Sequence, residues 1–312
     1  MFKGIIFALA ACFIWGMNYV IPQFLNGYSS VEIALWSYLF YGIFSFVIMM
    51  RERAKGLCRY PRAIWIKALY FSLISTLVYY ISLVLALRYS NPAITALIMG
   101  VSPIMIACYG GWKEKVMNLR AFIVPSILIL IGIVIINVPH LHDNESPSDH
   151  VLGLFFCCVA LVTWSWYVVA NSDFLKHNPK VSSSDWSTLI GVSTLFWVAL
   201  LTIVMSLFFA DKMPLKKYTT FSAELARFYG ATLFLGLVCS WLAAFLWNRA
   251  TYFLPVSLAG QLTIFETIFG MVFVYTLQCR LPPQTECVGI AFLLGAVAYG
   301  IRLTTQPAQA SA

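Results

Sequence analysis

One acidic residue, Glu266, stands alone in an apolar stretch that is long enough to cross a membrane. The stretch runs from Pro255 to Leu277, and its 23 residues would span a bilayer core as a helix. Glu266 lies at its midpoint, where a charged side chain costs roughly 2.5–3.5 kcal/mol to insert. Such an acid either hydrogen-bonds a neighbouring helix in its neutral form or faces an internal cavity. We take it as the first candidate site residue.

The residues around this acid suggest that it faces inward. Ala259, Thr263, Glu266, Gly270 and Phe273 follow a spacing of three to four residues, so they share one face of a helix. A low dielectric favours the neutral form of a carboxyl group, so Glu266 could exchange a proton near neutral pH. This predicts a transporter in which a proton and a substrate compete or cooperate at Glu266.

Aromatic rings within other apolar stretches could complete a site around the acid. The deeper ones are Trp15, Tyr19, Tyr79, Tyr80, Trp164, Tyr167 and Trp241. An acid among such rings can hold an ammonium group by ion pairing and cation–π contact. That chemistry favours a cationic or zwitterionic substrate over a phosphate or carboxylate, which would want basic side chains. The alternative for each ring is packing in the core or against lipid.

Two amides and a proline are further candidates. Asn18 and Gln261 lie inside apolar stretches, either as substrate contacts or as hydrogen-bonding links between helices. Pro103 would free the carbonyl of Met99 and kink a helix at its middle. That carbonyl could accept a hydrogen bond from an amine or water, or the kink could serve packing alone.

The elements that must position these residues are membrane-spanning helices. The chain is 61% hydrophobic and 10% charged, against about 25% charged residues in ordinary soluble proteins, and its mean hydropathy is +0.84. We expect an all-α integral membrane protein with ten transmembrane helices and no soluble domain. The ten apolar segments are Gly4–Leu25, Ile33–Met50, Ala68–Leu87, Pro92–Trp112, Leu119–Val138, Val151–Ala170, Trp186–Phe209, Tyr229–Trp247, Pro255–Leu277 and Glu286–Leu303.

Basic residues predict how these helices are oriented. With a cytoplasmic N-terminus, 14 of the 20 Lys and Arg residues fall inside, most of that excess coming from the first half. Both termini are then cytoplasmic, in the inner or plasma membrane. The net charge of +8 is explained by this topology, so no nucleic-acid partner is expected.

The two halves of the chain resemble each other. Gly4 and Trp15 match Gly153 and Trp164 at an offset of 149, and Ser30-Val31-Glu32 resembles Ser183-Ser184-Asp185 at 153. At an offset of 163, Pro92, Ala96 and Gly132 match Pro255, Ala259 and Gly295, and Pro103 takes the place of Glu266. Because five is odd, a repeated five-helix unit is inverted. We expect two inverted five-helix repeats, 1–140 and 151–312, joined by an extracytoplasmic linker at 141–150, and a functional monomer that holds its substrate near the midplane.

Three motifs resemble the drug/metabolite transporter superfamily in its ten-span, EamA-type branch. They are AACFIWGMNYVIPQF, LALRYSNPAITALIMGVSPIM and FLWNRATYFLPVSLAGQLTIFETIFG. The resemblance implies a two-fold bundle with a central cavity and alternating access by rocking of the halves. It does not fix the small-molecule substrate, because the superfamily moves amino acids, choline, nucleosides and S-adenosylmethionine; the acid and the rings favour an amino acid or another amine. The family's acid after the fourth span is matched by Glu114, whereas its counterpart after the ninth span is replaced by Cys279.

Other classes of function find less support in the sequence. A lipid flippase could use the same fold. The sequence does not resemble a membrane-embedded enzyme, because it has no HExxH, no GxSxG, no paired intramembrane aspartates and no histidine within a span. We expect no cofactor and no metal: there is no phosphate-binding glycine loop and no CxxC, and His140 and His142 fall in a polar loop. Cys279 and Cys287 flank a short loop and could pair.

Overall fold

A computed structural model describes residues 1–25, 27–52, 60–89, 95, 98–113, 119–137, 147–208, 218–219 and 222–305. Within these residues it contains helices and no strands. Seven helical stretches of the described chain are long and apolar enough to cross a membrane, and Ile123–Ile136 and Gln284–Tyr299 are shorter apolar helices. The prediction of an all-helical membrane protein is thereby confirmed. Glu114, His140, His142 and most of the linker at 141–150 lie outside the described residues.

Continuous and interrupted helical spans follow one another along the chain. In order they are α1 (Phe2–Gly16), η1 (Met17–Tyr19), η2 (Ile21–Phe24), α2 (Ser30–Glu52), α3 (Arg62–Ser72), η5 (Leu73–Val78), α4 (Tyr79–Tyr89), α6 (Ser102–Lys113), α7 (Leu119–Asn137), α8 (Pro147–His177), α9 (Ser183–Phe208), α10 (Ala223–Phe234), η9 (Leu235–Leu242), α11 (Ala243–Thr251), α12 (Val256–Leu262), α13 (Ile264–Leu277) and α14 (Gln284–Thr305).

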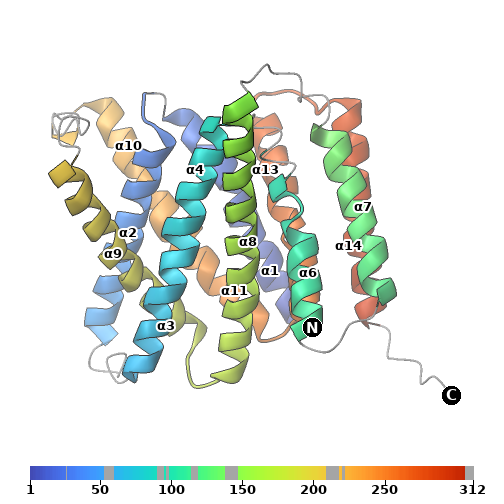
Figure 1. The fold of residues 1–312 in the computed structure, drawn as a ribbon, viewed down its shortest axis with the longest axis horizontal. Coiled ribbons are helices and arrows are strands. Elements are labelled where there is room, and N and C mark those ends of the chain that lie inside the picture. The colour runs from blue at the N-terminus through green and yellow to red at the C-terminus, as the bar shows by residue number, and fades with distance from the viewer. Residues whose placement is uncertain are drawn as a thin grey trace.

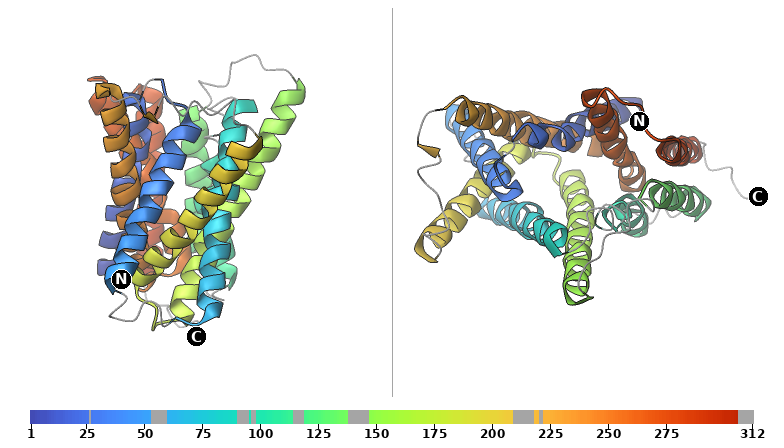
Figure 2. Two further views of the ribbon diagram at one scale, coloured as in Figure 1. Left: turned by 90° about the vertical axis from the view of Figure 1, so that its left-hand side faces the viewer. Right: turned by 90° about the horizontal axis from the view of Figure 1, so that it is seen from above.

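The helices form one bundle that is elongated in cross-section. Helices α7 and α14 pack against each other at one end of it, and α2 and α9 cross at the other (Figures 1 and 2). Helix α1 begins and α14 ends at the lower edge of Figure 1, whereas α2 and α10 begin at the upper edge. These two edges are called the lower and upper edge below.

Polar side chains fix where several helices begin. The N–H of Leu225 donates to Ser222 Oγ at the start of α10. At the start of α2, the Ser29 N–H donates to Glu32 Oε2 and the Glu32 N–H donates to Ser29 Oγ, which forms a capping box. Such caps satisfy backbone donors that would otherwise lack a partner in the first turn of a helix.

Two spans contain a π-helical segment at corresponding places. Segment η5 separates α3 from α4, and η9 separates α10 from α11, with Leu235 following Leu73 by 162 residues. π-helical turns are rare and often lie at functional sites, because the extra residue per turn re-aims the side chains that follow. The side chains re-aimed here include Tyr79, which directly follows η5.

The first and ninth spans are not continuous helices, which corrects the prediction from hydropathy. Helix α1 ends at Gly16 and continues as two short 3₁₀ turns, the second containing Pro22, which has no N–H to donate. The ninth span is divided at Thr263 into α12 and α13. Glu266 therefore lies in the first turn of α13, rather than at the middle of an unbroken helix.

Pro103 also lies in a first turn. The backbone turns at Gly100 and Val101, and α6 begins at Ser102. Proline is compatible with this position, since the N–H it lacks would have no helical partner there. The turn, rather than a mid-helix proline, interrupts this span.

Small residues allow α6 and α12 to approach closely. A Cβ atom at Gly110 would meet Val256 Cγ1 at 2.5 Å, and one at Gly260 would meet the backbone N of Ala107 at 3.0 Å. Small residues thus allow close helix contact at these positions.

Candidate functional site

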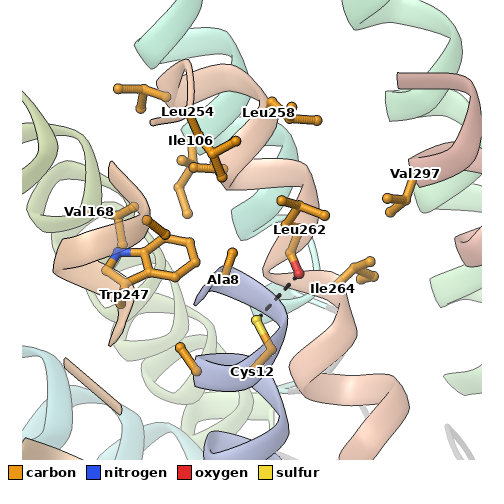
Figure 3. Close-up of a cluster of buried hydrophobic side chains, with 14 of the residues drawn as sticks. Ala8, Cys12, Ile106, Val168, Trp247, Leu254, Leu258, Leu262, Ile264 and Val297 are labelled. Carbon is orange, nitrogen blue, oxygen red and sulfur yellow. Dashed lines mark hydrogen bonds between the residues drawn. The ribbon is translucent and has the colours of Figure 1, made fainter. Parts of the chain in front are cut away.

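The interruption at Thr263 creates an unusual stretch of backbone at the centre of the bundle. The N–H of Thr263 donates to the Gly260 carbonyl at 3.3 Å, and the N–H of Glu266 donates to the Thr263 carbonyl at 3.0 Å. In a regular helix the N–H of Glu266 would donate to the Leu262 carbonyl instead. That carbonyl accepts the thiol of Cys12 from α1 at 3.4 Å (Figure 3). Non-helical backbone at membrane depth is tolerated where protein groups satisfy it in this way.

Glu266 lies next to this interruption, on the first turn of α13. Its side chain is partly buried and interacts electrostatically with Cys12, Tyr19 and Tyr79. Among the described residues no basic side chain forms an ion pair with it. The first turn of a helix is a favourable place for an acid, because the backbone N–H groups there point toward it.

Tyr19 is held against α13 by a glycine. A Cβ atom at Gly270 would meet Tyr19 Cδ2 at 2.5 Å, so the ring lies directly on the glycine backbone. Tyr19 also interacts with the side chain of Thr267, one residue after Glu266. Tyr19 as a whole residue nevertheless keeps 46% of its surface exposed. The contact with Gly270 therefore fixes the ring without burying the whole residue.

A cluster of rings from four spans lies beside Tyr79. The Tyr79 ring stacks on Trp164 with centroids 5.0 Å apart, and Trp164 lies 5.8 Å from Tyr167 and 6.4 Å from Trp15. Trp15 in turn lies 5.5 Å from Trp247. Tyr79 also interacts electrostatically with Glu266, which relates the cluster to the acid.

The structure thus brings together about half of the residues that the sequence singled out. Glu266, Tyr19, Tyr79 and the rings of the cluster are neighbours. Tyr80 instead donates to the Ser30 carbonyl at 2.5 Å, and Trp241 Nε1 donates to Thr188 Oγ1 at 3.2 Å. The remaining candidates are Gln261, buried on α12; Asn18, exposed in η1; Met99, partly buried before the turn at Gly100; and Pro103, buried in α6.

Several polar residues of the interior were not expected from the sequence. Asn171 Nδ2 donates to Asn248 Oδ1 at 2.9 Å, Asn248 Nδ2 donates to Ser187 Oγ at 3.0 Å, and Trp186 Nε1 donates to Asn171 Oδ1 at 2.6 Å. All four residues are at most 3% exposed. Asn171 and Asn248 each lie at the end of an apolar stretch, and these two amides were the sequence feature that could have predicted the network. Trp247 and Cys12 were also missed, because neither is polar enough to stand out.

A hollow in the described part of the structure lies apart from this group. A pocket of about 200 Å³ at the upper edge is lined by Phe24, Leu25, Tyr28, Glu224 and Arg227. None of the residues around Glu266 lines it. In the described part of the chain there is no group of three or more His, Cys, Asp or Glu side chains placed to hold a metal, and Cys279 and Cys287 are both free.

Comparison with known proteins agrees with the geometry. The model of the EamA-like transporter family matches residues 2–138. The inner membrane protein YtfF of Escherichia coli (strain K12) is 25% identical over 309 residues, which cover 97% of this chain and 96% of that protein. A solved crystal structure shares the fold with a TM-score of 0.75 at 16% sequence identity, covering 96% of both chains. The matched residues include Cys12 and Trp15 of α1, Tyr19 of η1 and Tyr79 of α4, which belong to the group around Glu266, so this part of the chain is similar to the EamA-like transporter family.

Proposed function

We propose that the protein is a secondary active transporter that moves a small amine-bearing metabolite, such as an amino acid, across the inner membrane by alternating access. The observation that carries this proposal is the environment of Glu266. The acid lies at a helix interruption beside the rings of Tyr19 and Tyr79, with no basic partner among the described residues. An acid and ring faces together bind an ammonium group by charge and by cation–π attraction.

The architecture of the proposal is two inverted five-helix repeats, 1–140 and 151–312, joined by the linker at 141–150. Helix packing supports this architecture. Under a two-fold axis, an element either packs on its own equivalent, or its contact with another element recurs between the equivalents of both. The equivalent elements α2 and α9, and α7 and α14, pack together, α6 of the fourth span packs on α12 of the ninth, and α1 packs on α11 as α8 packs on α4. Trp15 and Trp164, equivalent by sequence, have ring centroids 6.4 Å apart.

Local interruptions support the same repeat. The N–H groups of Val101 and Ile104 donate to carbonyls three residues earlier, as do those of Thr263 and Glu266. The two turns are therefore 162 residues apart, like η5 and η9. This register places Ile104, rather than Pro103, opposite Glu266. Only the second half therefore carries an acid at this position. The site is asymmetric, although the proposed fold is two-fold symmetric.

Proton coupling is the second part of the proposal. A carboxyl group in a protein interior can bind and release a proton near neutral pH when its neutral form is favoured. Substrate amine and proton would then compete for Glu266, and each would be carried in the half-cycle when the other is absent.

Orientation and partners complete the proposal. The relative from Escherichia coli is named as an inner membrane protein. The lower edge carries Lys3, Arg51, Arg62, Lys113 and Arg249 at helix ends, which supports a cytoplasmic lower edge and two cytoplasmic termini. Its partners are the lipid bilayer, protons and a small solute, and the repeated halves supply both walls of a cavity, so the working unit is a monomer.

Ligand-dependent thermal stabilisation of the purified protein tests the substrate class. We expect an amino acid or a quaternary amine to raise the melting temperature, because a ligand at 100 times its dissociation constant adds about 2.7 kcal/mol. The stabilisation should be lost in Glu266→Gln, which keeps the shape of the side chain and removes its charge. Repeating the titration in wild type from pH 5.5 to 8.5 should show weaker binding at low pH, where the proton occupies the acid.

The matched control is Glu224→Gln, an exposed acid in the first turn of α10, which should leave the stabilisation unchanged. Stabilisation by a lipid headgroup or an anion, unaltered in Glu266→Gln, would contradict the proposal and favour a flippase or another class of metabolite. Amine stabilisation that does not vary with pH would contradict proton coupling alone.

A further inference from the structure

A tyrosine and a carboxylate join the two halves of the chain at the lower edge. Tyr60 lies two residues before α3, in the first half, and its hydroxyl donates to Asp185 Oδ2 at 2.7 Å. The Tyr60 hydroxyl oxygen also lies 3.3 Å from the Lys180 carbonyl oxygen. Asp185 lies in the first turn of α9, in the second half. The contact therefore crosses from one proposed repeat to the other.

A second contact of the same kind lies at the upper edge, with the halves exchanged. Tyr218, in the stretch before α10 in the second half, donates its hydroxyl hydrogen to Glu32 Oε1. Glu32 lies in the first turn of α2, in the first half. Helices α2 and α10 begin at this edge, whereas α3 and α9 begin at the lower one (Figure 1).

The two contacts occupy equivalent places in the repeat. Ser29 and Glu32 correspond to Ser182 and Asp185, in each case at an offset of 153. Both pairs also cap their helix, since the N–H of Asp185 donates to Ser182 Oγ at 3.0 Å as that of Glu32 donates to Ser29 Oγ. Each acid is thus held at the start of its own helix. Each tyrosine comes from the segment before the third span of the opposite half.

The chemistry of the contacts suits a bond that forms and breaks. A phenol donating to a carboxylate makes a charge-assisted hydrogen bond, which is stronger than one between neutral groups. Burial, followed by the hydrogen bond to the acid, raises the pKa of both the Tyr60 and the Tyr218 hydroxyls, so both remain protonated donors at neutral pH. At the lower edge Lys113 Nζ also lies 2.8 Å from Asp173 Oδ2, so the tyrosine–carboxylate contact is one of several interactions that join the halves there.

We propose that Tyr60–Asp185 and Tyr218–Glu32 are paired latches that hold the lower and upper edges closed, and that one of them opens in each half of the transport cycle. This rests on the alternating access proposed above. With the lower latch broken, the edge that contains Tyr60 separates while Tyr218 still holds the opposite edge, and the reverse applies in the other state. Using the same pair of groups at both edges keeps the two states close in free energy.

The chain offers matched controls at both edges. The Tyr252 hydroxyl donates to the Val181 carbonyl at 2.6 Å near the lower edge, and the Tyr229 hydroxyl donates to the Tyr218 carbonyl at 2.9 Å near the upper edge. Both bonds join residues of the second half only. They should persist when the two halves separate, so removing them should not favour either state.

The test measures the separation of the halves at each edge by pulsed electron paramagnetic resonance. The natural cysteines are replaced by serine, and spin labels are attached to Arg62→Cys with Lys180→Cys for the lower edge, or Val31→Cys with Ala226→Cys for the upper edge. All four positions are exposed. The parent protein and the variants Tyr60→Phe, Tyr218→Phe, Tyr252→Phe and Tyr229→Phe are compared in nanodiscs.

We expect Tyr60→Phe to raise the long-distance population of the lower pair about tenfold without lengthening the upper pair, and Tyr218→Phe to do the reverse. Tyr252→Phe and Tyr229→Phe should match the parent. If both edges loosen in each latch variant, or if neither changes while the parent still samples open and closed edges, the latches are disproved and transport by alternating access stands. If no variant and no parent sample ever separates either pair, alternating access itself is contradicted.

Discussion

At the scale of single residues, the structure changes the meaning of Glu266. An acid at the centre of an unbroken membrane helix is costly, and that cost made it conspicuous in the sequence. In the folded chain it occupies the first turn of α13, where N–H groups without helical partners favour a negative charge. The interruption at Thr263 therefore reduces the cost of charging Glu266.

The position of Tyr19 can be tested through the glycine on which it rests. Gly270→Ala places a methyl group 2.5 Å from Tyr19 Cδ2, so the ring must move away from the α13 backbone. We expect a loss of about 1–3 kcal/mol of stability, as for other overpacked sites, together with weaker binding of an amine. Thermal unfolding with and without ligand measures both effects.

Gly295→Ala is the matched control for this prediction. It lies in a helix of the same half, and nothing approaches within 4 Å of the added methyl group. It should leave ligand stabilisation unchanged and slightly favour the helix. Equal losses in the two variants would show that the position of Tyr19 is not set by Gly270.

At the scale of elements, the spans divide into continuous and interrupted helices. Helices α2, α8 and α9 run without a break, whereas the first, third, eighth and ninth spans change to 3₁₀, π or turn geometry part-way. The interrupted spans supply Tyr19, Tyr79 and Glu266. Irregular backbone lets one span present groups that a regular helix would keep in its own hydrogen bonds.

The amide network that ties α8, α9 and α11 together makes a prediction about these elements. Asn171→Ala and Asn248→Ala should each cost about 1–3 kcal/mol of stability, because each leaves a buried amide of the partner without its hydrogen bond. The double variant should cost less than the two single losses combined, with a coupling of about 0.5–3 kcal/mol. Denaturation of the purified variants gives these values, and strictly additive losses would mean that the amides act independently.

At the scale of the whole molecule, the relation of the two termini is a further prediction. Helix α1 begins and α14 ends at the same edge, which also carries Lys3 and Arg302. We expect reporters fused to either end to be active only in the cytoplasm, since loops rich in lysine and arginine are retained there. A fluorescent protein that folds only in the cytoplasm and a phosphatase that folds only outside it distinguish the two cases. Opposite locations for the two ends would contradict an even number of spans.

Much of this fold could be predicted from the sequence. Apolar stretches of about 20 residues can only be membrane helices, because backbone groups in lipid must satisfy one another. The match of Trp15 with Trp164 and the similarity of Glu32 to Asp185 predicted a repeat. The sequence also singled out Glu266, since an ionisable group within such a stretch is exceptional.

Only the tertiary structure decided which groups surround that acid. Hydropathy averages over several turns and cannot detect the single turn at Thr263 that brings Glu266 to the start of a helix. Tyr19 and Tyr79 interact with Glu266 from positions about 190–250 residues away in the chain. Tyr80, which directly follows Tyr79, instead donates to the Ser30 carbonyl. Local patterns determine which segments are helices and which face is apolar; the partners of a polar group depend on how helices distant in sequence pack, which no local pattern encodes.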